Sequence, residues 1–312
     1  MELIDKIKGA LAGFAFGDAL GLGTEFMNRN EIASYYPRKC RRFSDIIRDA
    51  HRCQWEPGEW TNDTEMLLCY IGSFLDCNGF DVHHQAETLK KWLDDKNLDT
   101  PPVLNRVCKT PGWAEHPISV AHRVWLSSGI SEASNEAVHR GLVTGMLSRP
   151  AHLEEDTRRI TLMTNDDSRC VSSTTVIARV AHDLLYNGEV TPIEKLVEIC
   201  QDIDPRTIPY LMAAYEGELE DLEIDDEETM MFTRKSMASA LWALWHTDNA
   251  PDMIYAVVDA GGDADTNAAI SGTFAGIKYG YDALPDEKDK MPGLQSLLAT
   301  ADRIAAFITA RN

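Results

Sequence analysis

The sequence predicts an all-α fold in one compact domain, and three observations support this prediction. Apolar residues recur at helical spacing in one segment after another along the 312 residues. No convincing run alternates between apolar and polar side chains as a half-buried strand would, and no internal repeat is present. Polar residues able to cap a helix precede several of the periodic segments. We therefore expect a single domain over residues 1–312, with long loops and polar clusters at helix N-termini.

The composition is that of a globular protein with a large negative charge. Hydrophobic residues make up 44% and charged residues 26% of the chain, and its length allows a substantial core. The net charge of −20, without a basic stripe, argues against a nucleic-acid partner. A small anionic ligand stays possible, because local N–H groups and a bridging cation can hold it whatever the overall field.

Cysteine usage and the N-terminal residues predict the cellular location of the protein. The seven cysteines are scattered without a C-x-x-C pair, which indicates reduced thiols and a cytoplasmic location. The first residues carry charges where a secretory signal would be apolar. No window of about 20 residues is free of charge, so no membrane span is expected. We expect a monomer without a membrane partner.

The first element is a helix over residues 3–20. Gly9, Gly13 and Gly17 recur on it every fourth residue and form a groove of small side chains, along which another helix can approach closely. The helix leads into a glycine-rich turn and then Glu25. That carboxylate is either presented at a site or simply solvated at the surface.

The second region of interest begins after an irregular, partly basic connection over residues 28–58, with a short helix near 31–36. A helix then starts at Thr61 or Asp63 and buries an apolar face. Four oxygen-bearing side chains stand in succession at this helix start: Thr61, Asn62, Asp63 and Thr64.

The middle of the chain is predicted as further helices separated by loops. The stretch 100–135 is expected to be rich in loops, and the acidic segment 216–228 is expected to be an exposed surface insertion rather than a binding site. An amphipathic helix over 294–308 ends the chain. The other predicted helices cover 83–98, about 120–126, a segment ending near 148, a segment from about 174 to 185, 192–202, 205–215 and 234–245.

A second polar helix start lies at residues 259–276, which read DAGGDADTNAAISGTFAG. The double glycine allows a sharp turn, and Asp263, Asp265 and Thr266 follow it at the start of a small-residue helix. Such a cluster is either an ordinary N-cap or a set of hard oxygen ligands for a divalent cation such as Mg²⁺ or Mn²⁺. The starts near 61 and 263 are far apart in sequence and could meet around one ion.

Three motifs together resemble the ADP-ribosylglycohydrolase family. They are GDALGLGTEF at 17–26, WTNDTEM at 60–66 and GGDADTN at 261–267. The resemblance extends from Ile7 to about Gly280 with the motifs in family order. The family includes the hydrolase that reactivates ADP-ribosylated dinitrogenase reductase and the ADP-ribosylarginine and ADP-ribosylserine hydrolases. It implies a compact, orthogonal bundle of helices with a binuclear Mg²⁺ or Mn²⁺ centre in a cleft.

The resemblance also implies roles for individual residues. The metal ligands would be Thr61, Asn62, Asp63, Asp263, Asp265 and Thr266, with Asp265 as the bridging ligand. The catalytic residues would be Glu25, Asp63 and Asp265, which hold the metals and assist proton transfer as the C1″ bond to ribose breaks. The substrate contacts would be Asn135, Arg140, Asn165 and Gly262.

The sequence departs from the family pattern at three places. Asn62 stands where the usual T-D-D-T has its first aspartate, which removes one negative charge from the metal site. The usual G-N-G-x-x-M-R phosphate loop is SNEAVHR at 134–140, where both glycines are missing and Glu136 adds a negative charge. The usual T-H-x-D is Thr164-Asn165-Asp166-Asp167, so Asn165 replaces a histidine.

Two classes of function follow from these observations. The first is a metal-dependent hydrolase that removes ADP-ribose from a modified protein side chain, with arginine linkage favoured. The second is a protein of the same fold that binds ADP-ribose, or acts as a toxin-immunity factor, with weakened turnover. A hydrolase of another ribosyl or nucleotide substrate is a further alternative, because the loop at 134–140 is remodelled.

Overall fold

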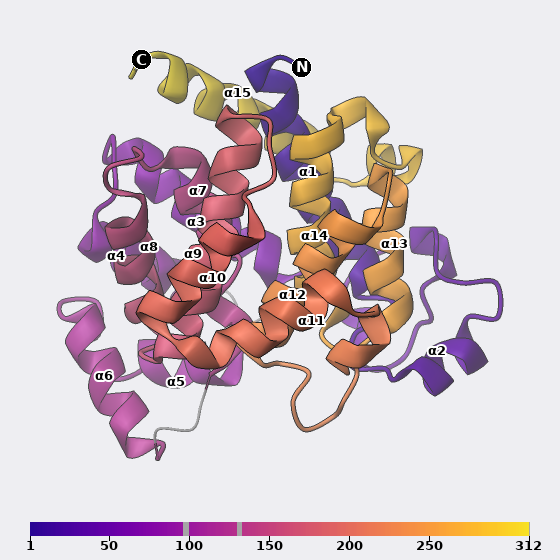
Figure 1. Ribbon diagram of the computed structural model, residues 1–312, viewed down its shortest axis with the longest axis horizontal. Helices are drawn as coiled ribbons and strands as arrows, with labels where there is room; N and C mark the ends of the chain where they lie inside the picture. Colours follow the sequence, from indigo (N-terminus) through magenta and orange to yellow (C-terminus); the bar gives the residue numbers. More distant parts are fainter. Residues whose placement is uncertain (96–99, 130–132, 312) are drawn as a thin grey trace.

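The computed structural model describes residues 1–95, 100–129 and 133–311. These residues form helices, short 3₁₀ turns and loops, and their only extended pairings are two isolated bridges, Met27–Gly262 and Ser134–Phe232 (Figure 1). The prediction of an all-α single domain is confirmed. The helices are α1 (Leu3–Gly21), α2 (Arg29–Tyr35), α3 (Asn62–Asp76), α4 (Val82–Asp95), α5 (Pro102–Cys108), α6 (Pro117–Ser127), α7 (Arg140–Leu147), α8 (Leu153–Leu162), α9 (Ser168–Tyr186), α10 (Ile193–Ile203), α11 (Ile208–Glu216), α12 (Thr233–His246), α13 (Ala250–Ala260), α14 (Ala264–Tyr279) and α15 (Leu294–Thr309).

The centre of the molecule is the close contact between α1 and α14. Their backbones touch at glycines, because a Cβ placed on Gly13 would lie 2.0 Å from the carbonyl oxygen of Gly272. A Cβ on Gly9 would lie 2.3 Å from the carbonyl oxygen of Gly276. The groove of small side chains predicted on the first helix is confirmed, and α14 fills it. Both helices are buried along most of their length. Asp18 near the end of α1 and Asp265 near the start of α14 are therefore held at fixed positions.

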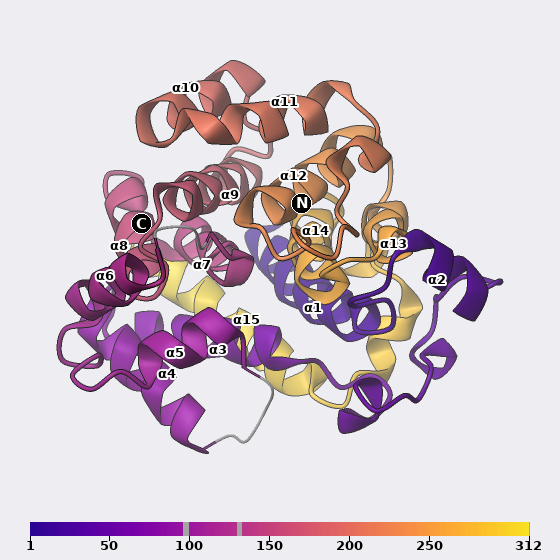
Figure 2. The ribbon, with the colours of Figure 1, turned by 90° about the horizontal axis from the view of Figure 1, so that it is seen from below.

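The remaining helices surround this pair in layers. α12, α13 and α15 pack directly against α1 or α14, and α9 connects them to α7 and α8. α10 and α11 form an outer layer over α9 and α12, as Figure 2 shows. α4, α5 and α6 lie together away from this layer, next to α3 and α8, as Figure 2 also shows. Residues from the N-termini of α3 and α14 line one shared cavity.

Three helices were not expected from the sequence. α5 lies in the stretch predicted to be loop-rich, and α8 and α13 lie in segments for which no helix was predicted. α5 and α13 carry proline in their first turn, where the missing N–H is harmless, so the prolines mark helix starts rather than loops. Five of the ten residues of α8 are charged and only Leu153, Ile160 and Leu162 are apolar, so few apolar residues mark the segment as a helix. The predicted end of the fourth helix at residue 98 lies outside the described residues.

The acidic segment at 216–228 combines exposed charge with buried apolar anchors. Its carboxylates are mostly exposed, whereas Leu219, Leu222 and Ile224 are buried against the rest of the molecule. Ile224 also touches the Gly262 turn, since a Cβ on Gly262 would lie 1.9 Å from the Ile224 carbonyl oxygen. The segment therefore supports the turn before α14.

Two further findings concern the whole described chain. No disulfide joins the seven cysteines, which lie in the described residues. Among the described helices none has the length and apolar character needed to cross a bilayer.

Candidate functional site

The turn between α13 and α14 sets the position of the first group of site residues. Gly261 and Gly262 have φ angles of +78° and +70°, which side-chain-bearing residues rarely adopt. Gly262 exchanges backbone hydrogen bonds with the chain after α1, with its N–H on Met27 O at 2.9 Å and its carbonyl on Phe26 N at 2.7 Å. These bonds bring Glu25, the residue before Phe26, close to Asp263, the residue after Gly262.

The start of α3 is held from α1 by a buried carboxylate. Asp18 accepts hydrogen bonds from the backbone N–H of Thr61 at 2.9 Å and of Thr64 at 3.0 Å. The Thr64 hydroxyl donates to the same carboxylate at 2.5 Å. Burial raises the pKa of Asp18, and these hydrogen bonds oppose that shift. Asp18 thus fixes α3 to α1 close to the glycine contact with α14.

The structure brings the two predicted polar helix starts together in one cavity. The Thr266 hydroxyl of α14 donates to Asp63 Oδ2 of α3 at 2.6 Å, and the Thr61 hydroxyl lies 3.4 Å from Asp265 Oδ2. Asn62, at the first position of α3, is half-buried and lines the same cavity. All six residues predicted to bind metal line it: Thr61, Asn62, Asp63, Asp263, Asp265 and Thr266.

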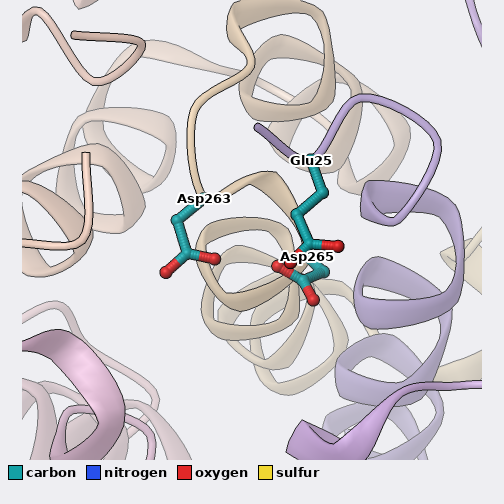
Figure 3. Close-up of side chains that lie close together, drawn as sticks. All are labelled: Glu25, Asp263 and Asp265. Carbon is teal, nitrogen blue, oxygen red and sulfur yellow. The ribbon is translucent and has the colours of Figure 1, made fainter. Parts of the chain in front are cut away.

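Three carboxylates converge at the centre of this cavity. Glu25, Asp263 and Asp265 each offer an oxygen, and these oxygens lie within 4.8 Å of one another. Figure 3 shows Glu25 reaching down from the turn after α1 towards the two aspartates at the start of α14. All three side chains are buried, with 8% exposure or less.

Several buried carboxylates share the cavity, and the described residues place no lysine or arginine there to balance their charge. Burial and repulsion from neighbouring carboxylates raise the pKa values of Asp63 and Asp265 well above the ordinary range. Burial also raises the pKa values of Glu25 and Asp263. No lysine or arginine lines the cavity among the described residues. A divalent cation would supply the missing charge, and the hard oxygen donors present are those that Mg²⁺ and Mn²⁺ prefer. The residues therefore fit such an ion.

Glu25 has a histidine partner that sequence reasoning missed. His51 Nε2 lies 2.6 Å from Glu25 Oε2, and this hydrogen bond raises the pKa of His51. Arg52 donates to the backbone carbonyls of Gly23 and Glu25 and so fixes the turn. His51, Phe26 and Trp55 form an aromatic wall of the cavity, with ring centroids 5.5 Å and 5.6 Å apart along the row. His51 lies in a connection that gave no periodic or motif signal.

Asn135 and Glu136 bring the loop before α7 to the cavity. Asn135 Nδ2 donates to Asp263 Oδ2 at 2.5 Å, and both Asn135 and Glu136 line the cavity. Glu136 accepts from the backbone N–H of Val103 at 3.2 Å and from Asn165 Nδ2 at 3.4 Å. Burial raises the pKa of Glu136. Glu136 is therefore a fifth acidic residue at the cavity, in addition to Glu25, Asp63, Asp263 and Asp265.

Three of the four predicted substrate contacts do not reach the cavity wall. Arg140 has 0% exposure, and its Nη1 donates to Ile160 O at 3.0 Å and to Thr164 Oγ1 at 2.6 Å. Arg140 stays a predicted substrate contact, and in this structure its side chain is directed between α7 and α8. Asn165 lies behind Glu136, and Gly262 contributes through the backbone of the turn. Asn135 is the predicted contact that lines the cavity.

Asp18 is a second residue that the sequence prediction did not assign to the site. It stands in the GDALG motif, and a carboxylate among glycines and apolar residues inside a helix was the available signal. Trp55 gave no signal of its own.

The fold and cavity together define an all-α protein with a buried, cation-competent carboxylate cluster between helix N-termini. A sequence model of the ADP-ribosylglycohydrolase family matches residues 1–311. The chain belongs to this family, and the predicted family and enzyme class are confirmed.

Named relatives and a solved structure agree with this assignment. The chain is 27% identical to "ADP-ribosylarginine hydrolase Tri1" of Serratia proteamaculans, over 91% of this chain and 74% of the relative. It is 27% identical to "ADP-ribosyl-[dinitrogen reductase] glycohydrolase" of Rhodospirillum rubrum, over 90% of this chain and 88% of the relative. A solved structure titled "ADP-ribosylglycohydrolase-related protein complex" matches with a TM-score of 0.73 and 24% identity, covering 98% of this chain and 99% of that one. This last match supports the fold.

Proposed function

We propose that this protein is a metal-dependent hydrolase that removes ADP-ribose from a modified protein side chain by hydrolysing the C1″ glycosidic bond. Arginine is the favoured linkage, because two of the similar proteins are named ADP-ribosylarginine hydrolases. The observation that carries the proposal is the convergence of Glu25, Asp263 and Asp265 in one buried cavity. We further expect a cytoplasmic monomer that uses no nucleic-acid partner.

In this proposal a binuclear Mg²⁺ or Mn²⁺ centre would be held by oxygens from two helix starts. Thr61, Asp63 and the amide oxygen of Asn62 would contribute from α3, and Asp263, Asp265 and Thr266 from α14. A bound Mg²⁺ or Mn²⁺ would orient the ribose hydroxyls and polarise water beside the anomeric carbon.

The protein side chains then divide the work of proton transfer and positioning. Glu25 lies beside Asp265 and is oriented by His51, so its carboxylate is placed to accept a proton from water. Asn135 holds Asp263 through its amide, which keeps the aspartate directed into the cavity. The aromatic wall to which Phe26 and Trp55 contribute would limit the access of bulk water to the cavity.

An incubation with defined substrates tests the proposal. The purified protein with Mn²⁺ or Mg²⁺ should release ADP-ribose from arginine-linked substrates, and EDTA should stop the release. A serine-linked substrate in parallel determines the linkage preference. Absence of release from both substrates with either ion would refute the hydrolase proposal.

The alternative is a protein that binds ADP-ribose, or neutralises a toxin, with little turnover. Two departures from the family pattern favour weakened turnover: Asn62 gives the cavity wall one carboxylate fewer, and the phosphate loop at 134–140 is altered. Calorimetry with ADP-ribose distinguishes the two proposals. Tight binding without release of ADP-ribose by the wild-type protein or by Asn62→Asp would favour the binding protein.

A further inference from the structure

One aromatic side chain of the cavity wall is open to solvent. Phe26 follows Glu25 directly in the chain and lines the same cavity. It is 46% exposed, whereas Glu25, Asp263 and Asp265 at the centre of the cavity are all buried. The Phe26 ring therefore lies at the rim of the cavity, where a ligand can contact it.

The backbone of Phe26 has a conformation that does not suit a bulky side chain. Its φ angle is +60°, in the left-handed region where a Cβ crowds the neighbouring carbonyl oxygen. The backbone bonds to the Gly262 turn fix this conformation, with Phe26 N 2.7 Å from Gly262 O and Gly262 N 2.9 Å from Met27 O. Glycine would adopt the same conformation without strain. Position 26 therefore contributes through its ring, because the backbone alone would be better served by glycine.

The ring is separated from the carboxylate cluster by one histidine. The ring centroids of Phe26 and His51 lie 5.5 Å apart, with the two planes tilted by 43°. His51 Nε2 in turn lies 2.6 Å from Glu25 Oε2. A substrate group held beside the Glu25 carboxylate is therefore within reach of the Phe26 ring.

An arginine-linked substrate would place a cation beside this carboxylate. Its guanidinium is bonded through one nitrogen to the anomeric carbon and carries a positive charge, whereas a serine linkage places a neutral oxygen there. An aromatic face attracts a guanidinium within about 6 Å of the ring centroid, and the aliphatic stem of arginine packs on apolar surface. Met231, which also lines the cavity and is partly exposed, adds such surface.

We propose that Phe26 determines specificity by receiving the guanidinium of the modified arginine on its ring. The inference rests on the proposed function, since it requires an ADP-ribosylated side chain in the cavity. The ring takes no part in breaking the glycosidic bond. It stabilises the bound arginine-linked substrate by about fivefold in affinity, and a neutral serine linkage gains nothing from it.

Variants of the ring test the proposal with ADP-ribosylarginine as the substrate and ADP-ribose, which lacks the guanidinium, as the reference ligand. With Mn²⁺, Phe26→Leu should lower kcat/KM for ADP-ribosylarginine by about fivefold, mainly through KM. The calorimetric Kd of ADP-ribose should stay within about twofold of the wild-type value, because no cation contacts the ring in that complex. Phe26→Tyr restores the aromatic face and should recover the affinity that Phe26→Leu loses.

Two further variants separate the guanidinium contact from an effect on folding. Phe26→Gly suits the left-handed backbone, and this relief offsets the apolar contact that is lost. Its melting temperature should therefore stay within about 3 °C of the wild type, while the fivefold loss for ADP-ribosylarginine remains. Tyr35 on α2 is 57% exposed and is not among the described residues that line the cavity. Tyr35→Leu, the matched control, should leave kcat/KM unchanged.

Calorimetry with ADP-ribosylarginine separates this inference from the proposed function. If the wild-type protein binds this ligand without releasing ADP-ribose, the hydrolase proposal fails, and an about fivefold weaker Kd for Phe26→Leu still supports the role of the ring. If Phe26→Leu and Phe26→Gly keep the wild-type kcat/KM and Kd for ADP-ribosylarginine, the inference is wrong. It is equally wrong if both variants weaken ADP-ribose by the same factor, or if the wild-type protein does not bind ADP-ribosylarginine.

Discussion

Replacing Gly13 by alanine tests the contact that holds the two halves of the site together. A Cβ at this position would lie 2.0 Å from the carbonyl oxygen of Gly272 and 2.6 Å from its carbonyl carbon. Heavy atoms in ordinary contact lie about 3.5–4.0 Å apart, so α1 and α14 must separate by more than about 1 Å. The obstacle is backbone, so no change of rotamer relieves it.

The expected loss follows from two opposing contributions. Overpacking in a dense core costs about 1–3 kcal/mol, and a clash with backbone puts Gly13→Ala at the upper end, about 3 kcal/mol. Alanine is a better helix former than glycine by about 1 kcal/mol, which offsets part of this. The net decrease in the free energy of unfolding is therefore about 2 kcal/mol.

Gly72→Ala is the matched control. Gly72 lies inside α3, and a Cβ there would have no other atom within 4 Å. Only the helix-propensity contribution applies, so this variant should gain about 0.5–1 kcal/mol. Denaturant unfolding of both variants should place them about 3 kcal/mol apart. Equal stability of the two variants would refute the packing argument.

The same pair of variants links the core to the site. α1 carries Asp18, which holds α3, and α14 carries Asp263 and Asp265. A displaced α14 should weaken the stabilisation by Mn²⁺ in Gly13→Ala, whereas Gly72→Ala should retain it. The increase of the melting temperature with Mn²⁺ concentration measures this directly.

Three further predictions concern the acidic cavity. Asp265→Asn should abolish the Mn²⁺-induced stabilisation seen in thermal unfolding and reduce kcat/KM by about 100-fold or more, because one of the central carboxylates is lost. A Mn²⁺ titration of this variant that matches that of the wild type would contradict the metal assignment. Asn62→Asp should raise the affinity for Mn²⁺ by about tenfold in calorimetry, since it adds a carboxylate to the cavity wall, and an unchanged affinity would exclude position 62 from the metal site. Burial raises the pKa values of Asp63 and Asp265 in the folded protein, so the metal-free form retains protons that the unfolded chain releases. The contribution of these two groups to the free energy of unfolding should therefore be largest below about pH 4 and fall as the pH rises from there to the raised values. The difference in the free energy of unfolding between the wild type and Asp265→Asn, followed against pH without metal, measures it, and a difference that does not change with pH would show that Asp265 titrates normally.

Much of the site could be predicted because its residues are close together in sequence. Asp263, Asp265 and Thr266 belong to one motif, and Thr61 and Asp63 belong to another, so each half was visible before the fold was known. The glycine spacing on α1 also predicted a close helix contact, since a groove of small side chains has one use in a buried helix. Short or charge-rich helices such as α5 and α8 escaped prediction, because α5 spans only seven residues and α8 has only three apolar residues among ten.

The sequence by itself thus determined the helical fold class, the family and the chemical character of the cavity. Only the tertiary structure decided which residues share that cavity. His51 meets Glu25, and Asp18 holds Thr61, through contacts 26 and 43 residues apart in the chain. Arg140 lies in a family motif yet points between two helices, because the direction of a side chain depends on the packing of its neighbours. Such contacts join segments that are separated in the chain, and local sequence carries no record of them.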